Sequence, residues 1–250
     1  MAGTYPNLAD GKPVRAGYTH SLVIRSDVKQ FRSGKEQRYA ISGLLNLFKF
    51  PYSNLKWTEV VSLRDFVITQ KGAFDSSWSI TLRDPFTLSD RSYANMGLDS
   101  DTFEYTETQN GRYSVSLSAS QTVGEAVTVN PQAAYPALST GAKVQLPNKV
   151  GLNYSTLRND LDCGKRIAYY SWSSPLRVMN LEYADITDAE VQTIVTHYQK
   201  AGGPVNPFSF TDPDSAAVYA VCRFSPDPIS ITRISKNSNR LTVGVEQYLS

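Results

Sequence analysis

The chain repeats its own opening phrase. YPNLADGKPV begins at Tyr5 and YPALSTGAKV begins at Tyr135, so Tyr, Pro, Leu, Gly and Val return in the same order at the same spacing. The offset between the two phrases is 135 − 5 = 130, which is about half the length of the chain. Self-similarity at a fixed period is the sequence signature of a repeated structural unit. This feature constrains the fold more than any other, because it predicts two halves that fold alike.

Matches later in the chain support the duplication. SGKEQRYA in the first half meets CGKRIAYY in the second at the same offset, since 164 − 34 = 130 for their glycines. An apolar strand pattern then leads into Asp84-Pro85 and into Asp212-Pro213, where the offset has closed to 212 − 84 = 128. Near the two ends NGRYSVSL corresponds to SNRLTVGV at this smaller offset. Small insertions explain this drift, so we predict two diverged copies of one domain.

Composition favours a mainly β fold for each copy. Hydrophobic residues make up 41% of the chain, which is enough to bury a core, and only 19% of the residues are charged. The 15 Tyr and 10 Phe suit the half-buried surface of strands. We predict the first copy at 1–120, a linker of small and polar residues at 121–134, and the second copy at 135–250. Each copy is expected to be a β-sandwich or a partly open barrel with one α-helix.

The clearest local signal is a helix in the second copy. Thr187 can act as its N-cap, and Glu190 three residues later completes a capping box. Gly202 supplies a left-handed stop, so we predict a helix over Thr187–Ala201. Its apolar residues recur at helical spacing and predict one buried stripe: Val191, Ile194, Val195 and Tyr198.

The first copy has a similar segment. We predict a helix over Thr58–Lys71 that ends before Gly72. With Thr58 as the N-cap, the carboxylate of a capping box should stand at position 61, where the chain has Val, so no box is expected. The apolar stripe is predicted at Val60, Leu63, Phe66 and Val67.

No set of residues indicates catalysis or a bound metal. The chain has two His and two Cys, and they share no metal-ligand spacing. We expect His197, whose counterpart in the first copy is Thr69 or a near neighbour, to be a surface or interface residue. The two cysteines, Cys163 and Cys222, are expected to be reduced and buried. No nucleophile elbow, phosphate-binding loop or dinucleotide motif occurs, so we expect no catalytic residue, no metal and no cofactor.

Asp84 and Asp212 could be read as a pair of catalytic carboxylates. Each precedes Pro after a strand, where Asp is a common turn former, and the two lie in different copies. We therefore favour the structural interpretation, although a β-sandwich hydrolase that depends on these residues stays an alternative.

Charge and hydropathy argue against two classes of partner. The formal net charge is +2, which is too small to predict binding to nucleic acid or to a membrane surface. The most basic run is Arg25–Arg38, and Asp27 and Glu36 interrupt it, so we expect a solvated or interface segment. The start of the chain has no apolar core of a secretory signal, and no stretch approaches about 20 apolar residues, so no membrane association is expected.

The order of these features resembles a known family. It is shared by the small minor tail proteins of lambda-like phages (the M family) and by the distal tail proteins of related phages and gene-transfer agents. Their pattern begins with a Gly followed by Gln-Arg and a pair of strands. A helix that ends in Gly comes next, and then an aromatic strand before Asp or Pro. In the first copy this pattern falls on Gly34, Gln37-Arg38, Gly72, Trp78 and Asp84-Pro85. In the second copy it falls on Gly164, Gly202-Gly203, Phe208, Phe210 and Asp212-Pro213, and AVCRFS resembles the Val-x-Cys-x-aromatic strand of that family. The second copy departs from the pattern at Arg166-Ile167, where Gln-Arg is expected, and a duplication is not typical of the short family members.

The resemblance implies two tandem tail-tube-like domains and a structural role in a virion. Such proteins assemble in the bacterial host cytoplasm into a ring at the tail tip, between the tail tube protein above and the tip hub protein below. DNA then passes through the lumen without sequence-specific contact. A chain with two such domains could close a ring of 3 × 2 = 6 domains as a homotrimer. The alternative is a homohexamer in which one copy builds the ring and the other projects outward.

The segments before the two helices are the candidate contacts between subunits or with the lumen. These hairpins are predicted around Arg38–Tyr52 and Lys165–Tyr183, with Pro51 and Pro175 at ends, turns or edges because Pro lacks an N–H. The alternative is that they are ordinary strands of the core. The residues proposed for contact are Arg38, Tyr39, Leu45, Phe48, Phe50, Lys165, Tyr169, Trp172 and Arg177.

A binding module is the main alternative to a ring component. A tandem β-sandwich of a tail fibre could recognise carbohydrate on a bacterial surface. Tyr169, Tyr170 and Trp172 would then serve as platforms on which sugar rings stack. The two functions predict different behaviour in solution, since only the ring component needs to self-assemble.

Overall fold

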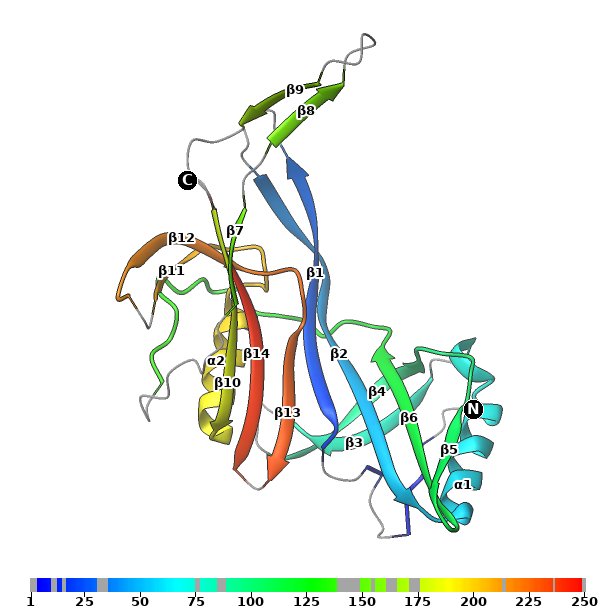
Figure 1. Ribbon diagram of the computed structural model, residues 1–250. Coiled ribbons are helices and arrows are strands. Elements are labelled where there is room, and N and C mark those ends of the chain that lie inside the picture. The colour runs from blue at the N-terminus through cyan, green and yellow to red at the C-terminus, as the bar shows by residue number, and fades with distance from the viewer. Residues whose placement is uncertain are drawn as a thin grey trace.

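A computed structural model describes residues 4–9, 13–14, 17–30, 36–74, 77–84, 89–138, 149–153, 156–160, 166–170, 176–212, 215–235 and 237–248. Over these residues the chain is mainly β with one α-helix in each half, which confirms the predicted fold class (Figure 1). The first half holds β1 (Thr19–Gln30), β2 (Glu36–Leu55), α1 (Trp57–Thr69), the 3-10 turn η1 (Gly72–Phe74), β3 (Trp78–Arg83), β4 (Asp90–Leu98), β5 (Tyr105–Gln109) and β6 (Arg112–Gln121). The second half holds β7 (Lys149–Asn153), β8 (Thr156–Asp160), β9 (Arg166–Tyr170), β10 (Leu176–Ile186), α2 (Asp188–Lys200), β11 (Phe208–Thr211), β12 (Val218–Phe224), β13 (Ile229–Ser235) and β14 (Ser238–Gln247).

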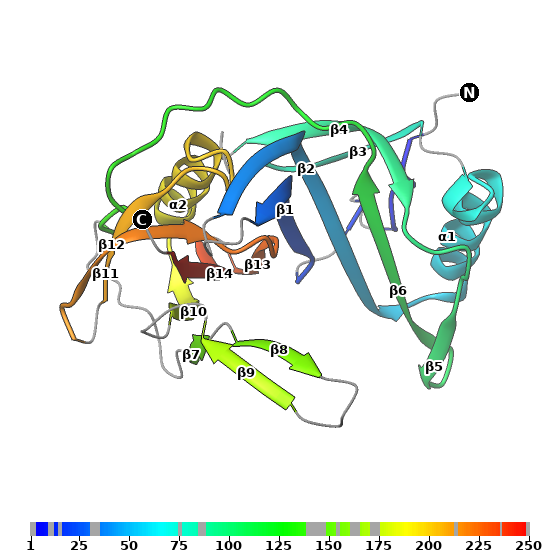
Figure 2. The same ribbon diagram turned by 90° about the horizontal axis from the view of Figure 1, so that it is seen from above.

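The strands of both halves join in one antiparallel sheet. Its main path runs β7–β10–β14–β13–β1–β2–β6–β5. β12 and β11 continue from β14, β4 and β3 continue from β6, and β8 and β9 form a separate hairpin. Seen from above, this path follows an arc, with the two helices far apart (Figure 2). The sequence predicts a separate sandwich or barrel for each copy, whereas here β1 of the first half pairs with β13 of the second.

A β-bulge stands at the same place in both halves. The register of β2 against β6 shifts after Tyr52, and the register of β10 against β14 shifts after Tyr183. Within these bulges Asn54 and Asp185 have φ angles of 59° and 56°, which Asn and Asp adopt more readily than most residues. Both pairs share the offset 131 (183 − 52 and 185 − 54), so the backbones follow the same course before their helices.

The last strands of the two halves match at a different offset from the one that the sequence suggests. The alignment of NGRYSVSL with SNRLTVGV places Tyr113 against Leu241. In the structure Val115 lies opposite Tyr52, and Leu241 lies opposite Tyr183, so the offset is 241 − 115 = 126. The predicted alignment is therefore wrong by two residues. A shift of two leaves every side chain on its face of the sheet, so the alternating pattern could not reveal it.

The repeated opening phrase has the same role in both halves. The N–H of Tyr5 donates to a carbonyl of β3 (2.9 Å), and the N–H of Tyr135 donates to the equivalent carbonyl of β11 (2.8 Å). The hydroxyls of Tyr5 and Tyr52 lie 2.7 Å apart, and those of Tyr135 and Tyr183 lie 3.3 Å apart. The phrase thus fixes the start of each half to an edge strand and places a hydrogen-bonded pair of tyrosines in each core.

The helix of the second half agrees with its prediction. The N–H of Glu190 donates to the hydroxyl of Thr187 (3.3 Å), and the carboxylate of Glu190 accepts the N–H of Thr187 (3.0 Å). Gly202 follows the helix with a φ of 68°, the left-handed conformation that Gly adopts at little cost. The predicted stripe is buried: Val191, Ile194, Val195 and Tyr198.

The helix of the first half begins earlier than predicted. Lys56 is its N-cap, and the carboxylate of Glu59 accepts the N–H of Lys56 at 2.8 Å. The expectation that no carboxylate caps this helix is wrong, because it placed the N-cap at Thr58, two residues too late. Lys71 and Gly72, with φ of 55° and 63°, end the helix. The four predicted apolar residues are buried: Val60, Leu63, Phe66 and Val67.

His197 lies in the core, so the expectation of a surface histidine is wrong. The residue is only 4% exposed. The offset of 197 − 66 = 131 makes Phe66 its counterpart, and not Thr69. The ring of Phe66 packs edge-on against Tyr5 and against the aromatic residue that opens β3, and the ring of His197 packs in the same way against Tyr135 and the residue that opens β11. His197 is buried because it completes this aromatic cluster.

The segment predicted as a linker, 121–134, lies against β2. Leu44 and Glu125 exchange two backbone hydrogen bonds of 2.9 and 2.8 Å. The backbones touch at Gly43 and Gly124, where a Cβ on either residue would clash with the other segment. Three residues of the first half also belong to the core of the second: Leu22, Ile24 and Leu44. The domain boundaries themselves stay a prediction, since the two halves share this core.

Candidate functional site

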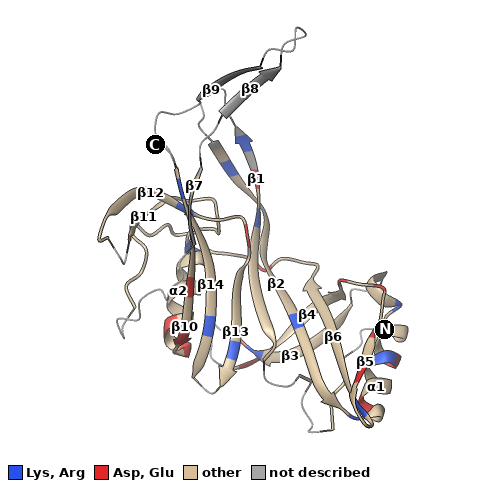
Figure 3. Ribbon diagram, in the orientation of Figure 1, with Lys and Arg blue, Asp and Glu red and all other residues tan. Residues whose placement is uncertain are grey.

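Two hairpin arms extend from the same end of the molecule. The first is the outer part of β1 and β2, where Ser26–Gln30 pairs with Glu36–Ala40. The second is the β8–β9 hairpin, which extends at the same end of the molecule, at the top of Figure 1. Basic residues are spaced along the first arm (Figure 3), and Arg25 and Lys29 of β1 are exposed. These two residues agree with the predicted solvated or interface segment at Arg25–Arg38, whereas 31–35 of that run lie outside the described residues.

Arg38, a predicted contact residue of the first arm, is held within the chain. Its guanidinium lies 3.4 Å from the carboxylate of Glu246 and stacks over the ring of Tyr248 at 4.6 Å. Its side chain is only 5% exposed. The neighbouring Tyr39 is 42% exposed and is contacted by Lys29 at 5.6 Å from the ring centre. Arg38 thus fixes the arm to the C-terminal strand, whereas Tyr39 is open to a partner.

The other predicted contact residues divide between the core and the surface. Leu45, Phe48 and Phe50 are buried, which agrees with the alternative interpretation that this part of β2 is an ordinary core strand. Arg177 is partly exposed and lies over the ring of Tyr219 at 4.9 Å. Tyr169 is placed by its backbone in β9. Outside the described residues lie Lys165, Trp172, Tyr170 as a side chain, Gly34, Gly164, Pro85, Pro175 and Pro213.

Asp84 and Asp212 close hairpin loops, as the structural interpretation predicts. The N–H of Asp84 donates to Ser89 (2.8 Å), and the N–H of Asp212 donates to Ala217 (2.9 Å). The carboxylate of Asp84 is buried and lies 3.5 Å from the guanidinium of Arg91. These contacts agree with the interpretation of both residues as turn formers.

The two halves are joined in one sheet by a short strand junction that the sequence does not predict. In β1 and β13, Thr19 lies opposite Thr232 and Ser21 lies opposite Ser230. The hydroxyls of these two pairs are 3.2 and 3.1 Å apart. On the other face of the junction the apolar side chains are buried: Leu22, Ile229 and Ile231. β1 and β13 therefore form a specific contact with a fixed register.

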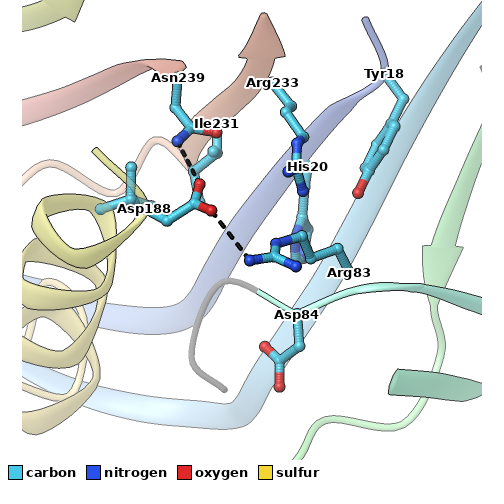
Figure 4. A pocket seen from close by; sticks show the side chains of 9 residues that line it. Tyr18, His20, Arg83, Asp84, Asp188, Ile231, Arg233 and Asn239 are labelled. Carbon is cyan, nitrogen blue, oxygen red and sulfur yellow. Dashed lines mark hydrogen bonds and ion pairs between the residues drawn. The ribbon is translucent and has the colours of Figure 1, made fainter. Parts of the chain in front are cut away.

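A polar clamp reinforces this junction at one end. The guanidinium of Arg83, from β3 of the first half, lies 3.1 Å from Asp188 at the start of α2 (Figure 4). The side-chain amide of Asn239 donates to the same carboxylate at 2.7 Å. These residues border a cavity of about 40 Å³ that Tyr18 and Arg233 also line. The clamp holds a hairpin of the first half against the helix of the second.

A buried polar network lies beside the junction, in the first half. Nε2 of His20 is 2.8 Å from Oδ1 of Asn46, and the amide nitrogen of Asn46 donates to Gln121 at 2.8 Å and to Glu125 at 3.2 Å. Since the oxygen of Asn46 is left to accept, Nε2 of His20 carries the proton. Burial lowers the pKa of His20 to about 4, so the imidazole is neutral at pH 7. Arg91 pairs with Glu125 at 2.7 Å and completes the network.

The remaining features concern the cysteine thiols, metal-binding groups and membrane-spanning helices of the described residues. Cys222 is buried and unpaired with another cysteine, and burial raises the pKa of its thiol to about 12. This agrees with the predicted buried thiol, whereas Cys163 lies outside the described residues. The described residues contain no group of three His, Cys, Asp or Glu side chains placed to hold a metal ion. In the same part of the chain, neither helix is long and apolar enough to span a membrane.

Comparison with known proteins adds no family to this description. No family model matches the sequence, and no curated protein matches it.

Proposed function

We propose that this chain is a structural protein of a phage tail tip, of the distal tail or minor tail class, and that it forms a ring between the tail tube and the tip hub. The observation that carries the proposal is the order of strands in the sheet. The main path reads β7–β10–β14–β13 and then β1–β2–β6–β5, which is one four-strand unit used twice. The two units meet through one junction of two different strands, β13 and β1.

A contact between two different surfaces of identical units can repeat, because each new unit again presents a free copy of one surface. When a head-to-tail contact repeats with a constant rotation, the units close into a ring or extend into a filament. Here one such junction is already present inside the chain, and the arc in Figure 2 supports closure. Ring closure also removes free sheet edges, which are otherwise prone to aggregation.

The shared sheet favours a homotrimer over a homohexamer. Both halves contribute four strands to the same path, so neither half projects away from it as the hexamer with an outward copy requires. Three chains then supply 3 × 2 = 6 units. The two arms at one end of the molecule would contact the next component of the tail, the tube protein or the hub, and DNA would pass through the lumen without sequence readout.

Deletion of the coding sequence from the phage that carries it tests the proposed function. The mutant should produce tail tubes that lack a completed tip, and expression of the chain in trans should restore infectious particles. In restored particles, a gold label on the chain should lie at the tip of the tail tube. Infectious particles formed without the chain, or a label on the fibres together with glycan binding by a stable monomer, would overturn the proposal in favour of the carbohydrate-binding module.

A further inference from the structure

We infer that β7 of one chain pairs, antiparallel and in a defined register, with β5 of a second copy of this chain, so that Lys149 lies opposite Thr106 and Leu152 lies opposite Phe103. This inference deepens the proposed function and rests on its assembly of identical chains. It names the two edges that meet and the residues that face each other.

β7 is the equivalent of β1. Phe48 in β2 and Met179 in β10 are equivalent, because their offset of 179 − 48 = 131 is the same as the offset between the β-bulges of these two strands. β1 places His20 opposite Phe48, and β7 places Val150 opposite Met179. The offset between the two outer strands is thus 150 − 20 = 130. Residues Thr19 and Leu22 of β1 then correspond to Lys149 and Leu152 of β7.

β5 is the equivalent of β13. Tyr105 lies opposite Val115 in β6, and Ile231 lies opposite Leu241 in β14. Both pairs share the offset 126 (231 − 105 and 241 − 115). The two hairpins also share a register shift before their turns, after Glu107 and after Arg233 at the same offset. Thr232 and Ile229 of β13 then correspond to Thr106 and Phe103.

The register of the second junction follows from the first. Thr19 lies opposite Thr232, and Leu22 lies opposite Ile229, in the junction inside the chain. Replacing each residue by its equivalent places Lys149 opposite Thr106 and Leu152 opposite Phe103. Among the described residues, β7 pairs only with β10 and β5 pairs only with β6, so both outer edges are open.

Equivalent side chains are buried in the β1–β13 junction and exposed at the open edges of β7 and β5. Leu22 is 0% exposed, whereas its equivalent Leu152 is 57% exposed. Ile231 is 6% exposed, whereas its equivalent Tyr105 is 48% exposed. Every residue of β5 is exposed. Apolar side chains on an open sheet edge mark a site for strand pairing, and these two edges carry them at the positions that the internal junction buries.

Charge favours pairing of the two different edges over pairing of like edges. β5 and the residue before it carry Glu104 and Glu107, and β7 begins with Lys149. In the inferred register Lys149 is a diagonal neighbour of Glu104, which is a favourable cross-strand pair. Two copies of β5 would instead bring their glutamates to one shared edge, where like charges are destabilising. The inferred partner is therefore a second copy that presents its other edge.

Cysteine cross-linking of the full chain tests this register. Thr106→Cys and Lys149→Cys are combined with Cys163→Ser and Cys222→Ala, and the protein is oxidised in air at a concentration at which the chains assemble. The inferred junction predicts disulfides between chains, with the two introduced cysteines in one cross-linked peptide. A matched control carries Thr19→Cys and Thr232→Cys, whose native hydroxyls lie 3.2 Å apart, and should form a disulfide within one chain.

A second pair tests the register itself. Thr106→Cys with Asn153→Cys moves one cysteine four residues along β7, which is about 13 Å at about 3.3 Å per residue. A disulfide requires Cα atoms within about 7 Å, so this pair should not cross-link. Equal cross-linking of both pairs would overturn the inferred register.

Single variants separate the alternative pairings. Chains with Thr106→Cys alone should cross-link only when mixed with chains that carry Lys149→Cys alone. A disulfide dimer of either single variant by itself would show pairing of like edges and overturn the inference. Absence of the Thr106–Lys149 cross-link while the control disulfide forms would also overturn it, even if the chain is found at the tail tip. Conversely, the cross-link can form in a protein that is absent from tails, in which case the proposed function fails and the pairing stands.

Discussion

The two halves of the molecule have the same arrangement of strands and helix, but equivalent strands have different neighbours. β13 of the second half is covered by β1, and its apolar residues Ile229 and Ile231 are buried. β5 of the first half has the same position and has no such cover among the described residues, and Tyr105 is half exposed there. Equivalent strands are therefore paired with a neighbour in the second half, where β1 covers β13, and open at the outer edge in the first half, where β5 lies. Burial at equivalent positions therefore depends on the neighbours of a unit as well as on its fold.

The largest expected effect is a difference in stability between substitutions at equivalent positions of the two helices. Val195 is 0% exposed in the core that also contains Leu22 and Ile24, whereas its equivalent Arg64 (195 − 64 = 131) is exposed. Val195→Asp buries an unpaired charge and should lower the free energy of unfolding by more than about 4 kcal/mol, so that the second half does not fold. Arg64→Asp is the matched control and should change it by less than about 0.5 kcal/mol. Circular dichroism and thermal unfolding measure both, and similar losses in the two variants would contradict the assignment of the helix faces.

The next effect concerns assembly. Leu152→Glu places a charge in the inferred junction between chains and should weaken assembly without unfolding the chain, because Leu152 is exposed in the single chain. A cost of about 1–3 kcal/mol raises the dissociation constant roughly five- to 150-fold. Val218→Glu is the control, since Val218 is an exposed apolar residue of β12 and lies outside the junction. Sedimentation velocity at several concentrations measures the shift, and an equal loss in both variants would argue against the β7–β5 contact.

A smaller effect is expected in the dependence of stability on pH. Burial, and to a lesser extent Lys200, lower the pKa of His197 to about 4, and the same direction holds for His20. Because the unfolded chain binds protons near pH 6.5 and the folded chain does not, stability is full above pH 6.5 and falls as the pH approaches 4. His197→Phe restores the residue found at Phe66 and should remove about half of the slope between pH 7 and 5. An unchanged slope in urea unfolding at these pH values would show that His197 is protonated to the same extent in both states.

The smallest effect distinguishes the two helix caps. Thr187 caps α2 through its hydroxyl, whereas Lys56 at the start of α1 provides no side-chain cap. Thr187→Ala should cost about 1 kcal/mol. Lys56→Ala should be nearly neutral, because the capping bond there uses the backbone N–H, which the substitution keeps. Urea denaturation of both variants makes the comparison, and equal costs would contradict it.

Local signals in the sequence predicted the fold class and much of each half. The capping box of α2 and its buried stripe depend on residues close together in the chain, and the structure places them as expected. The N-cap of α1 was missed because Lys56 has no capping side chain, and only Glu59 three residues later could have revealed it. The burial of His197 was missed because a histidine there replaces the phenylalanine of the first half.

The junction between the halves could not be predicted from the sequence. Its paired strands, β1 and β13, lie near opposite ends of the chain, and their contact depends on the register of several intervening strands. A slip of two residues keeps the alternating pattern intact, so the sequence alignment was wrong in the last strands without any visible conflict. One signal was available: the matching Thr and Ser residues of β1 and β13, which form hydroxyl pairs across the junction.

An image of the purified chain at assembly concentration tests whether three chains close a ring. We expect a closed particle of three chains, with three times the 27.7 kDa mass of one chain, in which β7 of each chain lies beside β5 of the next. Cryo-electron microscopy along the particle axis should then show a continuous sheet with six similar units. A chain that stays monomeric at all concentrations, or a particle whose chains meet through other surfaces, would contradict the proposed trimeric ring.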